Sequence, residues 1–323
     1  MIRLSTSCIV VFLLMILFGK SLGQENLNCT RFLLLDSRLI KSVENAELVV
    51  STVEKHPGNP LFIEDKPWEK RFDNLYGNVI YDKEKGVYKC WYSPFIVDHS
   101  ALAMTIEERN KPYEDPDDRE MGICYATSLD GIKWEKPDLG LVTYEGSKQN
   151  NIIWRGPHGA GIYKDFRDPD PARRYKTIFQ GLSVSMSSDG LHWQEPKNCE
   201  GVDTAGDTHN NAFWAPTLDK YVAITRTGER GKDGDIRQVA RIESDDFLNW
   251  TTEEVVLQGS DPNLQMYAMP VFFHAGVYLG LLAVHDQEAD RVWTELTWSP
   301  DTKDWKRISP GTPLISNSEN KLD

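Results

Sequence analysis

Short runs of apolar and aromatic residues, separated by turns rich in Asp, Gly and Lys, recur along most of the chain without a long helical period. Three pairs of such runs are joined by short turns: 75–81 with 87–92, 211–217 with 220–225, and 267–273 with 277–283. A further β-rich run follows, as at 122–127 and 292–298. Closely spaced β-rich runs around polar turns predict antiparallel hairpins.

One pattern, Ser-x-Asp-x-x-x-Trp, occurs four times with unchanged internal spacing. It ends at Trp134, Trp193, Trp250 and Trp305, which are 59, 57 and 55 residues apart. Ser and Asp side chains accept hydrogen bonds from nearby backbone amides, so each copy predicts a hairpin turn with the Trp on the returning strand. A period of this size indicates stacked or radial units. Four short antiparallel strands per repeat predict an all-β fold, a β-propeller.

The pattern divides the chain into a propeller and its flanks. Four blades end at the repeat tryptophans within the predicted propeller, 69–310. The preceding segment, 24–68, contains two apolar runs that could supply strands of a further blade. A polar tail, 311–323, follows the last repeat. We therefore expect a propeller of the five-bladed type whose ring could be incomplete.

The first 23 residues read as a cleaved signal peptide. Arg3 precedes an apolar run at 8–18, and small residues occur at 21–23. The run has eleven residues, against the roughly 20 that cross a bilayer, and none later is longer, so no membrane anchor is expected. The predicted protein is secreted and extracellular. Its net charge of −13, or −15 without the leader, argues against nucleic acid as a partner.

Two sequence features fit an extracellular location. Asn28 and Asn249 begin N-glycosylation sequons. Four cysteines remain after the leader: Cys29, Cys90, Cys124 and Cys199. Cys90 and Cys124 fall on neighbouring predicted strands, which favours a disulfide between them. The alternative is that they are separate buried thiols that pack as small apolar groups.

Five segments carry a family resemblance. They are His-Pro-Gly-Asn-Pro at 56–60, Phe-Asp-Asn-Leu-Tyr at 72–76, Tyr-Lys-Cys-Trp-Tyr at 88–92, Gly-Asp-Thr-His-Asn-Asn-Ala-Phe-Trp at 206–214 and Tyr-Ala-Met-Pro at 267–270. They resemble uncharacterised secreted proteins related to five-bladed glycoside hydrolases of families 32, 43 and 117. The likeness to the uncharacterised group covers most of 31–314, whereas the likeness to the enzymes rests on blade pattern and fold. The group continues through another blade after 314, so the resemblance implies that this chain lacks the last blade.

The two faces of a propeller carry different residues, because both hairpin turns of a blade lie at one face. The repeat aspartates, Asp130, Asp189, Asp246 and Asp301, lie there and are expected to be structural. Arg167-Asp168-Pro169 matches a substrate-binding tripeptide of family 32, but it precedes a predicted strand as a turn, and we interpret it as a turn.

The opposite face carries the longer connections, where binding residues usually lie. These connections are 93–120, 138–150, 197–210, 226–236 and 284–291. The candidate residues on this face are Asp73, Asp98, His99, Asp207, His209, Glu229, His285 and Asp286.

Glycoside hydrolysis uses two carboxyl groups on either side of the scissile bond. Asp73 and Asp207, each just before a predicted inner strand, are the candidate pair. His209 or His285 could replace the acid as proton donor, with Asp286 tuning the imidazole. The remaining candidates are predicted to bind substrate. The simpler interpretation is that an Asp before a strand forms a turn.

Other ligands and chemistries receive less support. No cofactor is required and no dedicated metal site is expected, although the acidic segment 107–120 could attract calcium without the ordered spacing of a calcium loop. Nucleophile-elbow, phosphate-loop and zinc patterns do not occur. Aromatic residues could stack on sugars, but their strand positions favour the core: Trp91, Trp154, Trp214 and Tyr267.

Two functions fit this chemistry. The first is a secreted glycoside hydrolase-like protein that acts on or binds a glycan through the propeller funnel. The second is a non-catalytic extracellular protein, either lectin-like or an acidic component of a mineralised matrix, which the negative charge favours. Fold alone does not decide between them.

Overall fold

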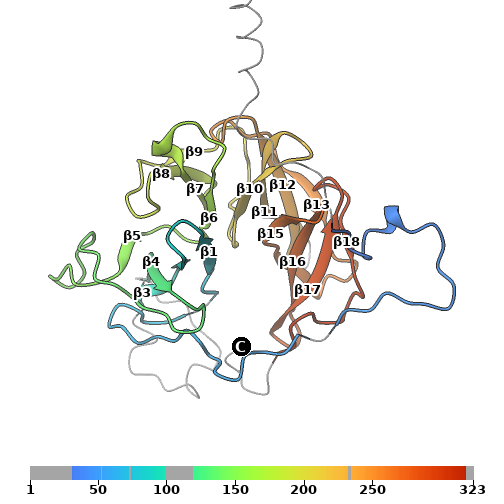
Figure 1. The fold of residues 1–323 in the computed structure, drawn as a ribbon, viewed down its shortest axis with the longest axis horizontal. Helices are drawn as coiled ribbons and strands as arrows, with labels where there is room; N and C mark the ends of the chain where they lie inside the picture. The colour runs from blue at the N-terminus through green and yellow to red at the C-terminus, as the bar shows by residue number, and fades with distance from the viewer. Residues whose placement is uncertain (1–30, 52, 73, 99–118, 232–233, 318–323) are drawn as a thin grey trace, which may run out of the picture.

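The computed structural model describes residues 31–51, 53–72, 74–98, 119–231 and 234–317. Within these ranges the chain is all-β, with four antiparallel sheets arranged as the blades of a propeller (Figure 1). The predicted fold class is therefore confirmed. The only helical elements among the described residues are two 3-10 turns, η1 (Ser37–Leu39) and η2 (Pro171–Arg173).

The strands follow one another blade by blade along the chain. Blade 1 contains β1 (Asn78–Asp82), β2 (Val87–Tyr92), β3 (Phe95–Val97), β4 (Glu120–Ser128) and β5 (Ile152–Arg155). Blade 2 contains β6 (Gly161–Lys164), β7 (Tyr175–Phe179), β8 (Ser183–Ser187) and β9 (Lys197–Asn198). Blade 3 contains β10 (Asn211–Ala215), β11 (Lys220–Gly231), β12 (Gly234–Ser244) and β13 (Glu254–Leu257). Blade 4 contains β14 (Leu264–Ala268), β15 (Val271–His274), β16 (Val277–Asp286), β17 (Arg291–Ser299) and β18 (Lys306–Arg307).

The first strand of each blade lies nearest the centre. β1 contacts β6, β6 contacts β10, and β10 contacts β15, so the inner strands stand side by side (Figure 1). In blade 4 the inner position is shared by β14 and β15, which both pair with β16. The segments that enter these strands consequently gather at one end of the central axis.

The repeated sequence pattern forms the turn that follows the third strand of each blade. In all four copies the Asp Oδ1 accepts hydrogen bonds of 2.8–2.9 Å from the amides two and three residues ahead. The Ser Oγ accepts a further bond from the amide of the Asp. The structural role expected for these aspartates is therefore confirmed.

Each repeat turn of blades 2 to 4 is also bonded by the blade before it. Trp91 Nε1 donates to the backbone oxygen of Gly190 at 2.7 Å, which joins blade 1 to the turn of blade 2. Arg173 Nη2 donates to the oxygen of Asp246, and Arg241 Nε donates to Thr302 Oγ1. The turn pattern thus contributes to blade packing as well as to its own hairpin.

A tyrosine on the second strand of each later blade makes a polar contact with the preceding blade. Tyr175 OH accepts from Lys89 Nζ at 3.0 Å, Tyr221 OH donates to Asp165 at 2.6 Å, and Tyr278 OH bonds Thr217. Burial raises the pKa of Asp165, but bonds from Tyr221 and from the fully buried Lys176 outweigh it, so the pKa is lowered. Removing one partner of a buried ion pair of this kind lowers the free energy of unfolding by about 3 kcal/mol.

The segment before blade 1 packs against both the first and the last blade. Phe62, Trp68 and Phe72 join the apolar cluster on one face of blade 1, whereas Leu33 and Val50 pack against blade 4. Figure 1 shows this segment, in blue, passing from blade 4 to blade 1. The described residues of 31–72 contain no β-strand, so the strands that 24–68 could supply to a further blade are not seen among them.

Two predicted loops and one predicted disulfide differ in the structure. The segment 226–236 is mostly strand, because β11 and β12 continue through it as one long hairpin. Likewise 284–291 is the end of β16, a tight turn and the start of β17. Cys90 and Cys124 are free buried thiols, opposite Ala126 and Tyr92 respectively, which agrees with the alternative to the disulfide.

The repeat turns predict a specific response to acid. Burial raises the pKa of Asp246, but amide hydrogen bonds from Asn249 and Leu248 outweigh this effect and lower the pKa to about 2, from 3.8. Because the folded state binds fewer protons than the unfolded chain between these values, the turn's contribution to stability is complete above about pH 4 and lost as pH falls towards 2.

We expect Asp246→Asn, which keeps the acceptor oxygen but cannot be protonated, to lose less stability between pH 4 and pH 2 than the unchanged protein. Urea unfolding midpoints across this range measure the difference. Asp304→Asn, at an exposed position of the last turn, should retain the original profile. Identical profiles for the Asp246 variant and the unchanged protein would contradict this origin of acid sensitivity.

Candidate functional site

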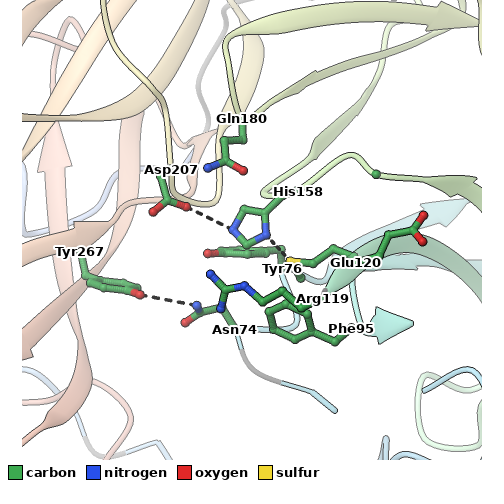
Figure 2. A pocket seen from close by; sticks show the side chains of 11 residues that line it. Asn74, Tyr76, Phe95, Arg119, Glu120, His158, Gln180, Asp207 and Tyr267 are labelled. Atoms are coloured by element: carbon green, nitrogen blue, oxygen red, sulfur yellow. Dashed lines mark hydrogen bonds and ion pairs between the residues drawn. The ribbon is translucent and has the colours of Figure 1, made fainter. Parts of the chain in front are cut away.

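A polar pocket of about 500 Å³ lies where the chain enters the inner strands. Side chains from blade 1, from the segments before β6 and β10, and from blade 4 line it (Figure 2). Asn74 Nδ2 lies 3.5 Å from Tyr267 OH and so connects the first and last blades across the pocket. The pocket is therefore built from segments far apart in sequence that the propeller brings together.

Asp207 and His158 form the central polar pair of the pocket. His158 Nε2 lies 3.2 Å from Asp207 Oδ1, and Arg226 Nη2 lies 3.1 Å from Asp207 Oδ2. Because an ionised carboxylate can only accept, His158 must present its Nε2 hydrogen to Asp207. The bond from His158 lowers the pKa of Asp207; burial opposes this, and the charge of Arg226 reinforces it. Asp207 is therefore ionised at neutral pH, with half of its side chain exposed to the pocket.

The second acidic residue at the pocket has a different environment. Glu120 forms a two-pronged ion pair with Arg155, through both Nε and Nη2 of the guanidinium. Figure 2 shows its carboxylate on the far side of the pocket from Asp207. Glu120 is therefore held by its ion pair with Arg155, whereas the carboxylate of Asp207 faces the centre of the pocket.

Aromatic rings and amides form the remaining walls. Tyr76 packs edge-on against His158, with ring centroids 5.0 Å apart, and Tyr267 stands on the opposite side (Figure 2). Asn74 and Gln180 add amide groups that can both donate and accept. This combination of flat rings and paired donors and acceptors suits a ligand with hydroxyl groups on an apolar frame.

Two glycines allow His158 to approach Asp207. Gly159 has φ +61°, and a Cβ there would lie 1.9 Å from the backbone oxygen of Thr208. A Cβ on Gly161 would lie 1.9 Å from the oxygen of Asn210. Only glycine permits these approaches of the chain before β6 to the chain before β10. The His-Gly-Ala-Gly sequence thus fixes the spacing of the polar pair.

Of the predicted catalytic residues, the structure places Asp207 in the pocket. Asp73 and His99 lie outside the described residues, as does the sequon residue Asn28. Asp73 directly precedes Asn74, which lines the pocket. The catalytic role of Asp73 stays a prediction. Glu229 belongs to β11, and its side chain is not among those described.

The predicted histidines do not line the pocket. His209 packs against Tyr76, with ring centroids 5.5 Å apart, and its Nε2 lies 3.2 Å from Asn78 Oδ1. Burial lowers the pKa of His209 to about 4, so its imidazole is neutral at pH 7 and is a poor proton donor. His285 packs edge-on against Tyr267 and contacts Asp290, not Asp286.

Three other predicted polar residues have structural partners. Asp98 is buried and pairs with Arg71 at 2.8 Å. Asp286 accepts from the amides of Glu288 and Ala289 in the turn between β16 and β17. The sequon residue Asn249 is exposed in a repeat turn, where its side-chain amide donates to Asp246.

The aromatic candidates and the family 32-like tripeptide lie in different parts of the fold. Trp91 is fully buried, as the core interpretation predicted, whereas Tyr267 lines the pocket. Arg167 lies in the turn after β6, stacked on Trp214 at 3.3 Å from the ring centroid, and Asp168 pairs with Lys176. The family 32-like tripeptide is therefore a turn outside the pocket.

Sequence reasoning missed His158, although a signal was present. Its segment is short, whereas the candidates came from long connections. Two glycines, Gly159 and Gly161, follow His158 at the entry to β6. Asp207 and His209 occupy the equivalent place before β10. Glycines at such a position indicate that two inner strands approach each other closely.

The described ranges contain neither a cluster of metal-ligating side chains nor a helix that could span a membrane. No group of three or more His, Cys, Asp or Glu side chains there is placed to hold a metal ion. Of the acidic segment 107–120, only the last two residues are described. In the same ranges no helix has the length and apolarity to cross a bilayer.

Solved structures share this architecture. One, described as a glycoside hydrolase, is 12% identical with a TM-score of 0.53, and the match covers 76% of this chain and 75% of that one. A second structure, an RGII complex, gives the same identity, score and coverage. A thermostable family-43 glycoside hydrolase is 13% identical, with a TM-score of 0.50 and coverages of 75% and 73%. The chain has the fold of the β-propeller glycoside hydrolases. At these identities the likeness concerns the fold alone. No protein-family model and no curated protein matches the sequence.

The polar pair generates a prediction about ionisation. We expect His158→Gln to raise the pKa of Asp207, because the imidazole bond is the largest influence that lowers it. Titration of the Asp207 carboxyl carbon by NMR measures the change. His192→Gln removes an exposed histidine that pairs with Asp189 and should leave Asp207 unaffected. An unchanged Asp207 pKa in the His158 variant would show that the pair does not control the carboxylate.

Proposed function

We propose that this protein hydrolyses a glycosidic bond in the central pocket. The observation that carries the proposal is the ionised Asp207 beside the Nε2–H of His158, at the mouth of a propeller with the glycoside hydrolase fold. Tyr267 supplies a surface on which a sugar ring can stack. The RGII complex among the similar structures adds a carbohydrate ligand on the same fold.

The proposed chemistry divides two tasks between two groups. The carboxylate of Asp207 activates a water molecule or attacks the anomeric carbon, while an acid protonates the leaving oxygen as the glycosidic bond breaks. His158 donates its Nε2 hydrogen to Asp207 and so orients the carboxylate. Asp73, which adjoins Asn74 at the pocket wall, is the candidate acid.

A second candidate function is glycan binding without cleavage. Hydrolysis uses two carboxyl groups. Among the described pocket residues Glu120 is paired with Arg155, so Asp207 alone presents a carboxylate to the centre, which favours binding without cleavage. The same aromatic and amide walls would serve a lectin. For either function we propose an extracellular location, in keeping with the leader sequence.

The two functions separate in one experiment. The purified protein is screened against a glycan array and a panel of soluble polysaccharides, with binding and reducing-sugar release recorded together. We expect Asp207→Asn to reduce product release by about 100-fold or more while binding persists, because proton-transfer and nucleophilic groups contribute factors of this size.

Asp203→Asn is the matched control, since Asp203 is an exposed aspartate four residues earlier on the same connection. It should retain full activity. Binding without product release by the unchanged protein would support the lectin function instead. Full activity in the Asp207 variant would remove the proposed mechanism.

A further inference from the structure

Two guanidinium groups flank the aromatic wall of the central pocket. Arg226 and Arg237 lie 4.9 Å and 5.4 Å from the ring centroid of Tyr267. Both come from the long hairpin of blade 3, Arg226 from β11 and Arg237 from β12. The hairpin therefore places two positive charges against Tyr267, although neither arginine is among the residues that line the pocket.

The charges around this wall do not cancel within the described residues. Arg226 is paired with Asp207, and Glu120 is paired with Arg155. Arg237 Nη1 donates to the neutral side-chain oxygen of Gln265 at 2.8 Å. Its charge also contributes to lowering the pKa of Asp207. A positive site of this kind contrasts with the net charge of −13 of the whole chain.

A third arginine reaches the same space from blade 1. Figure 2 shows the guanidinium of Arg119 directed into the pocket beside Asn74, on the side opposite Tyr267. Arg119 also stacks on Phe95, with 5.5 Å between the guanidinium carbon and the ring centroid. The pocket thus has arginines on two sides, each held against an aromatic ring.

We infer that the central pocket selects a glycan that carries an anionic group, a uronic acid carboxylate or a sulfate ester, which Arg237 binds at the Tyr267 wall. This inference rests on the proposed function, because it names the substrate class of the same site. A planar guanidinium presents two parallel N–H donors that match both carboxylate and sulfate oxygens. A neutral sugar leaves this charge without a partner, so the site discriminates by charge as well as by shape.

The test compares pairs of oligosaccharides that differ only in the anionic group. One pair is a galacturonic acid tetrasaccharide and its carboxyl-reduced, neutral form. The other is a sulfated galactose tetrasaccharide and its desulfated form. Binding is measured by calorimetry at 50 mM and 500 mM NaCl, and sugar release is measured in parallel.

We expect at least one anionic member to bind about tenfold or more tightly than its neutral partner, with the preference reduced at high salt. Which pair shows the preference distinguishes carboxylate from sulfate. Arg237→Gln should abolish the preference. Lys85→Gln removes the same charge from the turn between β1 and β2, at the other end of blade 1, and should leave it unchanged.

The outcomes also separate this inference from the proposed function. Equal or tighter binding of the neutral members, with hydrolysis intact, would overturn the anionic preference and leave the hydrolase standing. Tight, Arg237-dependent binding of an anionic member without sugar release would support the preference and overturn hydrolysis. A preference that survives in Arg237→Gln would contradict the assigned residue and with it the inference.

Discussion

Contacts between each blade and the repeat turn of the next determine where the inner strands stand. Each turn is held internally by its Ser and Asp, and externally by Trp91, Arg173 or Arg241 of the preceding blade. The tyrosine contacts exemplified by Tyr221 and Asp165 add a second connection across the interface. Because these bonds are buried or partly buried, loss of one partner leaves an unpaired polar group, which favours a single arrangement of the blades.

The polar pocket depends on that arrangement. With the blades fixed, the segments before β6 and β10 pass so closely that Gly159 and Gly161 admit no side chain. That proximity places His158 against Asp207, although the two residues lie on different blades. The chemistry of the site is therefore a consequence of backbone packing, and the turn pattern contributes to it from the other end of the blades.

The sequence predicted the repeated turns because their hydrogen bonds are local, between residues at most three positions apart. It also predicted that Asp207 lies where the chain enters an inner strand, and this followed from the order of the strands in a blade. It did not predict that Asp207 pairs with His158 and Arg226, because these contacts depend on packing between blades. The long hairpin of blade 3 was also missed, since its polar residues resemble those of a loop.

The crystal structure of the Asp207→Asn variant with an oligosaccharide bound is the most direct measurement of the central claim. The account predicts a sugar ring against Tyr267, within hydrogen-bond distance of residue 207 and of His158. A sugar bound elsewhere, such as the aromatic groove of about 580 Å³ beside Trp214 and Phe272, with the central pocket empty, would contradict it.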